Sequence, residues 1–395
     1  MSDVKLDRFC SYILPRTHHY IKKLILDTTS MERILLVGDY PNLTSLELFN
    51  FEQKIGFHYF TDDRPFRHIF KHQITDLILH NNDEYDDKTL MDIYTKNVYA
   101  HIMIFFQNLK DDLINLKCFS LTNYNYIYDY DDLVVPLLRR MTHLEKLTLY
   151  LRISKTGLFI GDASPFIDGI HLHNEILVHI PQLHTFKYYI STETCTDYSN
   201  LRISNRDIQQ TFTNIIKYGQ TACIMDYYGA SGTICHVYSL PFTFTHLYKI
   251  TTHFPFIVFD TVTHLSVYDI VPFKHEFFMR INQAFPLLKC FTVENDRMQY
   301  WNCNDNLSYP IIEFTYLISL EIIHAGIYYL EQFLVKTNTL LPRLTRLKVN
   351  YNYLKTVTIN FTREETRHNC SKVKQLIVED SIIFSKYVYQ YFPSL

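Results

Sequence analysis

The chain has 395 residues, of which 47% are hydrophobic and 20% are charged, with 31 Tyr and 29 Phe. This apolar content is enough to form a core, which excludes a disordered chain. The formal net charge of −3 and the lack of a long Lys/Arg run argue against a nucleic-acid-binding protein, because such proteins depend on neutralising phosphates. No uninterrupted apolar segment approaches the roughly 18 residues that cross a bilayer, so we expect no membrane partner.

One apolar spacing recurs along the whole chain. An apolar residue is followed by others three and five residues later, and we call these the first, second and third apolar positions of a repeat. Because side chains alternate between the faces of a strand, the second and third positions point to one face. The eleven sets are Ile21/Leu24/Leu26, Leu43/Leu46/Leu48, Ile74/Leu77/Leu79, Leu116/Phe119/Leu121, Leu144/Leu147/Leu149, Leu183/Phe186/Tyr188, Val262/Leu265/Val267, Leu288/Phe291/Val293, Leu317/Leu320/Ile322, Leu344/Leu347/Val349 and Val373/Leu376/Val378.

The spacing of these sets predicts a helix before each strand. The first positions 262, 288, 317, 344 and 373 are 26 to 29 residues apart, near the period of about 20–29 residues of leucine-rich repeats. A proline two residues ahead of the first position, as at Pro181 and Pro342, ends a helix and leads into extended chain. Local signals place four of the helices. Capping boxes occur at 29–32 and 362–365, Pro136 suits a first helical turn, and Asn174 suits a helix cap. We therefore expect an α/β leucine-rich-repeat solenoid, or horseshoe, with parallel strands on the concave side and helices outside, forming one domain over residues 1–395.

Two segments break the rhythm, residues 101–116 and 190–261. In the second, weak strand patterns surround Ile224 and Val237. Many such repeats have an asparagine eight residues after the first position. In this chain it occurs at Asn82 and Asn352, and other repeats have different residues there, so we expect an incomplete asparagine ladder. Residues 392–395 look like the start of a further repeat, and no polar cap is visible after Val378.

The sequence carries no convincing catalytic or cofactor-binding motif. Residues 275–279 begin like a zinc-protease motif but lack the second histidine. With nine glycines, the chain has no phosphate-binding glycine loop. The eight cysteines form no Cys-x-x-Cys pair, which favours reduced thiols in a cytoplasmic or nuclear setting. We expect no enzyme, no cofactor and no metal.

The strand phase predicts the side chains of the concave face, which lie two, four and six residues after each first position. This face also carries Asp76, His80, Lys146, His264 and Glu321. Tyrosine is enriched at interface hot spots because it joins an apolar ring to a polar tip. An alternative is that the tyrosines only cover strand ends in a tyrosine-rich chain. The candidate partner-binding residues are Phe49, Tyr150, Tyr189 and Tyr268, which could form a row, with Glu47, Lys187, Arg346 and Lys348.

Five stretches resemble a known family: residues 9–15, 30–36, 40–44, 137–141 and 238–242. They are similar to the repeat region of F-box/leucine-rich-repeat-like proteins expanded in some invertebrate genomes. In that family the F-box joins a ubiquitin ligase and the repeats hold a target. The resemblance implies a non-enzymatic scaffold that binds a protein partner through the concave face. The alternative is a substrate-recognition subunit of an SCF-type ubiquitin ligase with a ligase adaptor as a second partner, although an F-box of the Leu-Pro-x-Glu-x-Leu type is not found in this sequence.

Overall fold

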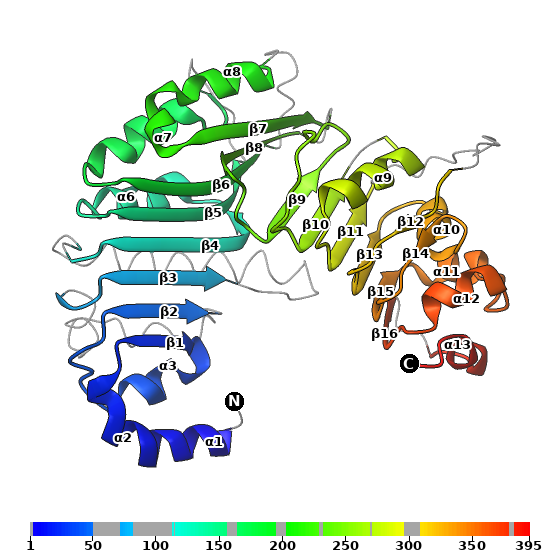
Figure 1. Cartoon of the computed structure of the whole chain (residues 1–395), viewed down its shortest axis with the longest axis horizontal. Helices are drawn as coiled ribbons and strands as arrows, with labels where there is room; N and C mark the ends of the chain where they lie inside the picture. Colours follow the sequence, from blue (N-terminus) through cyan, green and yellow to red (C-terminus); the bar gives the residue numbers. More distant parts are fainter. Residues whose placement is uncertain are drawn as a thin grey trace. The chain divides into compact units, whose positions relative to one another are not determined.

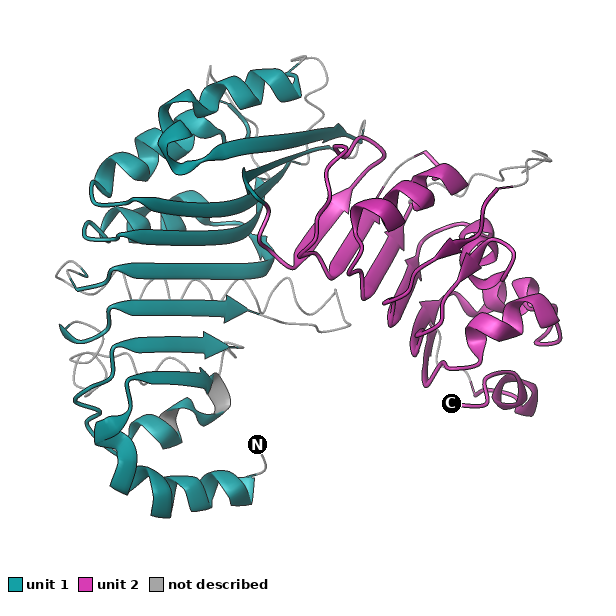
Figure 2. Ribbon diagram, viewed as in Figure 1, with its two compact units in different colours: residues 1–241 teal, residues 242–395 magenta. Residues whose placement is uncertain are grey.

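A computed structural model describes residues 3–49, 72–81, 113, 115–155, 164–194, 203–228, 232–268, 271–295, 309–378 and 383–395. The chain divides into two compact units, unit 1 (Met1–Pro241) and unit 2 (Phe242–Leu395), shown in Figure 2. Both units combine large sheets of mainly parallel strands with helices, so the expected mixed α/β class is confirmed. A single array over residues 1–395 stays a prediction, because the repeats are divided between the two units.

Unit 1 contains an eight-stranded sheet in the order β1-β2-β3-β4-β5-β6-β8-β7 (Figure 1). The first six strands are parallel, whereas β8 is antiparallel to both β6 and β7. The bounds are β1 (Lys23–Asp27), β2 (Ser45–Phe49), β3 (Asp76–Asn81), β4 (Cys118–Ile127), β5 (Lys146–Lys155), β6 (Thr185–Thr194), β7 (Gln220–Tyr227) and β8 (Thr233–Leu240).

Unit 2 contains a six-stranded parallel sheet in the order β16-β15-β13-β11-β10-β9 and a two-stranded sheet, β12-β14. The bounds are β9 (His246–Ile250), β10 (His264–Tyr268), β11 (Cys290–Glu294), β12 (Ile312–Glu313), β13 (Ser319–Ile323), β14 (Thr339–Leu340), β15 (Arg346–Val349) and β16 (Gln375–Val378).

All eleven strands predicted from the apolar spacing are present, and their register follows the repeat. The second position of one repeat pairs with the second position of the next, as in Leu46 with Leu77 and Leu320 with Leu347. Third positions pair in the same way, as in Leu48 with Leu79. The period-two phase is therefore confirmed, because one register places every core residue on the same face of its sheet.

Helices cover that core face. In unit 1 residues from α3 and α6 join the strand leucines in one apolar cluster, and in unit 2 Phe278 of α9 and Phe333 of α10 contact Phe291 of β11. The helices are α1 (Asp3–Arg8), α2 (Leu14–Thr17), α3 (Thr28–Leu35), α6 (Val135–Arg139), α7 (Gly169–Glu175), α8 (Asn205–Gln210), α9 (His275–Ala284), α10 (Ile327–Leu334), α11 (Tyr351–Val357), α12 (Glu364–Cys370) and α13 (Lys386–Tyr391). Short π-helical segments span Phe9–Ile13 and Tyr130–Val134, and 3-10 segments span His18–Tyr20, Leu177–His179 and Thr211–Tyr218.

Two expectations about helix ends are wrong. Asn174 does not cap a helix; α7 begins five residues earlier, where the side chain of Asp168 accepts a hydrogen bond from the amide of His171 at 2.9 Å. The capping box at 362–365 does not form either, because the N-cap of α12 is Arg363, which has no side-chain cap bond. Both helices nevertheless precede the predicted strands.

Apart from the repeat at Ile74, whose turn would start outside the described residues, every repeat begins with the same turn. We call it the leading turn: the four residues that end at the first apolar position. The amide of that position donates to the carbonyl three residues earlier, at 3.0 Å from Leu43 to Tyr40 and at 3.2 Å from Leu288 to Phe285. Except for the half-buried His18 of the first repeat, the residue at the start of the turn is itself buried, a core position that the sequence pattern missed. The buried residues in this position are Tyr40, Leu113, Met141, Ile180, Phe259, Phe285, Phe314, Leu341, Cys370 and Phe392.

The irregular segments have a partial explanation. Most of 101–116 lies outside the described residues. Within 190–261 the strands expected near Ile224 and Val237 are present as β7 and β8, but both take part in antiparallel pairs, which explains their weak match to the repeat.

The expected position of the asparagine ladder is wrong. Buried asparagines lie seven residues after the first position, at Asn81, Asn123 and Asn295, and not eight. The physical reason is the two-residue period, which turns position seven toward the core and position eight away from it. Asn82 lies outside the described residues, and Asn352 is exposed on α11.

Candidate partner-binding faces of the two sheets

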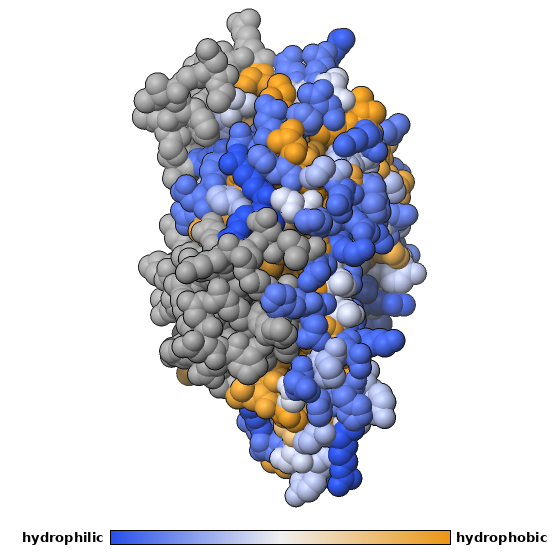
Figure 3. Space-filling model, turned by 90° about the vertical axis from the view of Figure 1, so that its left-hand side faces the viewer, coloured by the Kyte–Doolittle hydropathy of each residue, from blue (hydrophilic) through white to orange (hydrophobic). Residues whose placement is uncertain are grey.

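Each of the two large sheets has a face that points away from the described helices covering its core, and we call it the open face. In β2 the alternation is complete, since Leu46 and Leu48 are buried whereas Ser45, Glu47 and Phe49 are partly exposed. Residues two, four and six after each first position occupy this face, as the sequence predicts. The open face is thus distinct from the core. The leading turns of unit 1 lie at the N-terminal ends of its strands, and among the described residues on that side hydrophilic residues alternate with smaller hydrophobic patches (Figure 3).

The open face of β1–β3 carries a charged and aromatic group that we call the Glu47 cluster: Lys23, Glu47, Phe49 and His80. The carboxylate of Glu47 lies 2.8 Å from Lys23 Nζ and 3.5 Å from His80 Nε2. The ring of Phe49 stacks on that of His80, with centroids 4.9 Å apart. Burial lowers the pKa of His80, with Glu47 opposing the shift. The cluster therefore holds a paired carboxylate beside a fixed aromatic ring.

Tyr150 and Tyr189 lie side by side on β5 and β6, with ring centroids 4.6 Å apart. Tyr124 contacts Tyr150 at 5.0 Å, and the hydroxyl of Tyr189 lies 3.0 Å from His236 Nδ1. Both Tyr150 and Tyr189 are fully buried. The expectation that they face solvent is wrong, because side chains on both faces of β5 and β6 are covered at this point of the strands. Both tyrosines lie in the middle of their strands, β5 (Lys146–Lys155) and β6 (Thr185–Thr194), so the alternative that they cover strand ends does not describe them either.

The open face of unit 2 carries an ion pair between neighbouring strands. Arg346 Nη1 of β15 lies 2.9 Å from Glu321 Oε1 of β13, and Lys348 is in register with Glu321. Arg346 and Lys348 are both half-buried. Tyr268 of β10 is buried, with Lys249 Nζ 5.6 Å from its ring centroid.

Two histidines extend this face to β9 and β10. The rings of His246 and His264 stack with centroids 4.1 Å apart and planes 10° from parallel. Their Nδ1 atoms lie 2.8 and 2.9 Å from the hydroxyls of Thr245 and Thr263. Burial, together with the neighbouring His264, lowers the pKa of His246 to about 3. Burial therefore keeps the His246 ring neutral near pH 7.

The structure brings some of the predicted site residues together and separates others. Glu47 lies beside Phe49, and Arg346 is close to Lys348, whereas Lys187 is exposed on β6, away from both groups in the strand order. Tyr268 belongs to unit 2, so the predicted row of four aromatic residues is divided between units. The pattern overlooked Lys23, although it stands two residues after Ile21 and thus at an open-face position.

Comparison with known proteins adds no assignment: no protein-family model matches the chain, and a search of curated proteins gives no match. Within the described parts of the chain, no group of three or more His, Cys, Asp or Glu side chains could hold a metal ion. No helix of the described residues has the length and apolar character to cross a membrane. Six described cysteines, Cys10, Cys118, Cys223, Cys235, Cys290 and Cys370, are free thiols.

Proposed function

We propose that this chain is a non-enzymatic protein-binding scaffold, built as a leucine-rich-repeat solenoid, that holds a protein partner on its open faces. The solenoid is supported by the repeat of leading turn, strand and helix. One recurring pair of backbone hydrogen bonds joins the start of each strand to the chain just before the neighbouring strand. The amides of Thr75 and Asp76 both donate to the carbonyl of Thr44, and the amides of Thr345 and Arg346 both donate to that of Ile318. Repeats joined in this way bury their apolar faces only against neighbours.

The observation that carries the binding function is that charged and aromatic side chains are fixed on the open faces without belonging to the core. Glu47 and Phe49 are oriented by Lys23 and His80, and Arg346 is oriented by Glu321. Side chains held in place before binding lose less conformational entropy when a partner docks. Arginine and aromatic residues are also the types most enriched among interface hot spots.

The test is capture of partners by the full chain, followed by mass spectrometry. We expect Arg346→Glu and the double change Glu47→Lys/Phe49→Ala to lose proteins that the unchanged chain captures, with about a tenfold or greater drop in affinity for each lost hot spot. Lys355→Glu, at an exposed site on α11, is the matched control and should retain them. Retention by all variants, with unchanged melting temperatures, would refute the open faces as the binding site.

The same experiment addresses the alternative function. Cullin-type ligase subunits among the captured proteins would favour a substrate-recognition role in a ubiquitin ligase, and their absence would favour the scaffold. The free thiols fit the cytoplasmic or nuclear setting that we propose for either role.

A further inference from the structure

The leading turns of unit 2 lie side by side at the N-terminal ends of its strands. The amide of Ile318 donates to the carbonyl of Lys289 at 2.7 Å, which joins the turn at 317 to the turn at 288. The amide of Thr345 donates to the carbonyl of Ile318 at 2.9 Å, and the amide of Lys374 donates to that of Thr345 at 2.8 Å. We call the residues one before and one after the first positions 288, 317, 344 and 373 the turn edge of unit 2.

In unit 1 the equivalent positions serve the fold. Before the first position, the side-chain amides of Asn42, Gln73 and Asn115 each donate to a backbone carbonyl of the preceding repeat, at 2.6, 2.9 and 3.2 Å. After the first position, charges of opposite sign compensate each other, since Lys117 Nζ lies 2.9 Å from Glu145 Oε1. These side chains thus spend their polar groups on contacts within the chain.

The turn edge of unit 2 instead exposes apolar side chains. Leu287 and Tyr316 stand before the first position and Ile318 stands after it, and they are 41%, 40% and 41% exposed. Leu287 has no polar atom that could make the side-chain bond found in unit 1, so this turn gives up a stabilising contact and leaves apolar surface in water. Neighbouring exposed apolar residues mark interaction sites, and a local rule of the fold is typically broken where function requires it.

The same edge carries four exposed cations and no acidic residue. They are Lys289, Arg343, Lys372 and Lys374, and within the described parts of the chain none of them pairs with a carboxylate. Two are held in place, since the guanidinium carbon of Arg343 lies 5.1 Å from the ring centroid of Tyr316 and Lys372 Nζ donates to a backbone carbonyl at 2.8 Å. Adjacent turns are about 4.8 Å apart, less than the Debye length of about 8–10 Å, so neighbouring cations act together on an anion.

We infer that the turn edge of unit 2 is a docking surface for an acidic segment of a partner protein that carries apolar side chains beside its carboxylates. The apolar side chains cover Leu287, Tyr316 and Ile318, and the carboxylates pair with the cations of the turns at 344 and 373. The distance from the first to the last of the four turns is about 14 Å, which about five extended residues span. This surface is separate from the open faces, so the inference does not rest on the proposed function.

Charge and shape favour a protein segment over an anionic lipid surface. A bilayer faces much more of the chain than this edge, and the whole chain has a formal net charge of −3. A narrow acidic segment meets only the local cations, because salt screens the more distant carboxylates. Interfacial segments also bury an apolar face about 5–10 Å deep in a bilayer, whereas Leu287, Tyr316 and Ile318 are each more than half covered by the protein.

The probes are two labelled synthetic peptides, Leu-Phe-Ser-Asp-Glu-Glu and the same sequence in reverse order, so that both backbone directions are tested. Anisotropy with the full chain should show saturable binding of at least one of them. Replacing its three acids by Asn and Gln, or its two apolar residues by Ser, should each weaken binding by about tenfold or more, because both halves of the edge contribute. Added salt should weaken binding of the acidic peptide.

Variants of the chain locate the site. Arg343→Glu/Lys374→Glu should weaken peptide binding by about tenfold or more. The matched control is Lys336→Glu/Lys355→Glu, which changes the net charge equally at exposed positions away from the edge and should retain binding. The open-face change Glu47→Lys/Phe49→Ala should retain it too, so failure of this inference and failure of the proposed function are told apart.

A second arm keeps the test independent of how the variants fold. A photoreactive copy of the bound peptide is cross-linked to the unchanged chain, and the adducts should map to residues 286–289, 315–318, 343–345 and 372–374. Vesicles of phosphatidylserine and phosphatidylcholine should not sediment the chain. The inference is overturned by equal peptide binding of the two double-charge variants, by adducts on the open faces, by no saturable binding of either probe, or by vesicle binding that Arg343→Glu/Lys374→Glu abolishes.

Discussion

The buried amide of Asn369 offers a sharp test of how unit 2 is held together. Its Nδ2 donates to the carbonyls of Phe333, Leu334 and Thr339 at 3.1, 3.1 and 2.7 Å, and its Oδ1 accepts from the amide of Leu341 at 3.0 Å. Asn369 is 1% exposed, so water does not replace these bonds. One side chain on α12 thus satisfies the end of α10, the strand β14 and a leading turn.

Replacing Asn369 by alanine leaves the Leu341 amide and the Thr339 carbonyl without their partner and weakens the end of α10. At about 1–3 kcal/mol for each buried group left unsatisfied, the free energy of unfolding of unit 2 should fall by about 3–5 kcal/mol. The measurement is urea denaturation followed by circular dichroism, with hydrogen exchange at the Leu341 amide.

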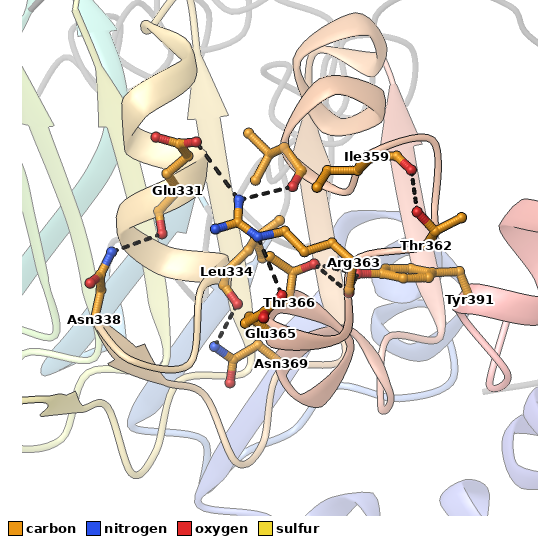
Figure 4. A network of polar contacts seen from close by, with 11 residues as sticks. Glu331, Leu334, Asn338, Ile359, Thr362, Arg363, Glu365, Thr366, Asn369 and Tyr391 are labelled. Atoms are coloured by element: carbon orange, nitrogen blue, oxygen red, sulfur yellow. Dashed lines mark hydrogen bonds and ion pairs between the residues drawn. The ribbon is translucent and has the colours of Figure 1, made fainter. Parts of the chain in front are cut away.

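Asn338→Ala is the matched control, because Asn338 is half-buried and makes one long bond, at 3.4 Å, to the carbonyl of Glu331 (Figure 4). It should cost about 0.5–1 kcal/mol. Equal losses for Asn369→Ala and Asn338→Ala would refute the view that Asn369 links three elements.

Three further predictions concern the strands. Leu347→Ala should cost about 2–5 kcal/mol of stability and Lys348→Ala about 0.5 kcal/mol or less, measured by denaturation, and equal effects would contradict the strand phase. Tyr150→Ala should lower the free energy of unfolding by about 3 kcal/mol or more, because the ring is buried. A loss of partner binding with an unchanged melting temperature would instead show that Tyr150 acts as a surface residue. The pKa of His246 is lowered in the folded chain, so its contribution to stability is present above pH 6.5 and is lost as the pH falls from 6.5 toward about 3. Denaturation curves measured over a pH series should show this loss, and His246→Gln should make the free energy of unfolding depend less on pH over the same range.

Much of the architecture could be predicted from the sequence because a strand with one buried face repeats its apolar residues at fixed offsets. That rule predicts the register in which Leu24, Leu147, Phe291 and Leu347 pair with their neighbours. It could not identify the buried residue that starts most leading turns, since Tyr40, Met141 and Phe285 have no common chemistry beyond size.

The candidate site was less predictable. Alternation tells which face a side chain leaves from, and this was sufficient for Glu47 and Arg346. It does not tell whether another part of the chain covers that face, which is why Tyr150 and Tyr189 are buried in spite of their phase. The antiparallel pairs of β7 and β8 were missed for a related reason, since strand direction depends on the connection and not on the apolar pattern.

Backbone strain was also beyond the reach of the pattern. Between α11 and α12 three consecutive residues have positive φ: Ile359 at 50°, Asn360 at 54° and Phe361 at 64°. The left-handed conformation costs about 1–2 kcal/mol for an ordinary residue and is least tolerated by a β-branched one such as isoleucine. The turn is held because the amide of Asn360 donates to the carbonyl of Lys355 at 2.8 Å and the amide of Phe361 donates to the hydroxyl of Thr358 at 3.1 Å.

Ile359 is 57% exposed, so its side chain contributes little burial against this strain. We expect Ile359→Asn to raise the free energy of unfolding by about 1 kcal/mol, because asparagine tolerates the left-handed region and the neighbouring hydrogen bonds use backbone atoms. Ile311→Asn is the control, since Ile311 is similarly exposed, at 54%, and is not among the residues with positive φ. Urea denaturation of both variants decides the matter: if Ile359→Asn is no more stable than Ile311→Asn, the left-handed turn carries no strain that a side chain can relieve.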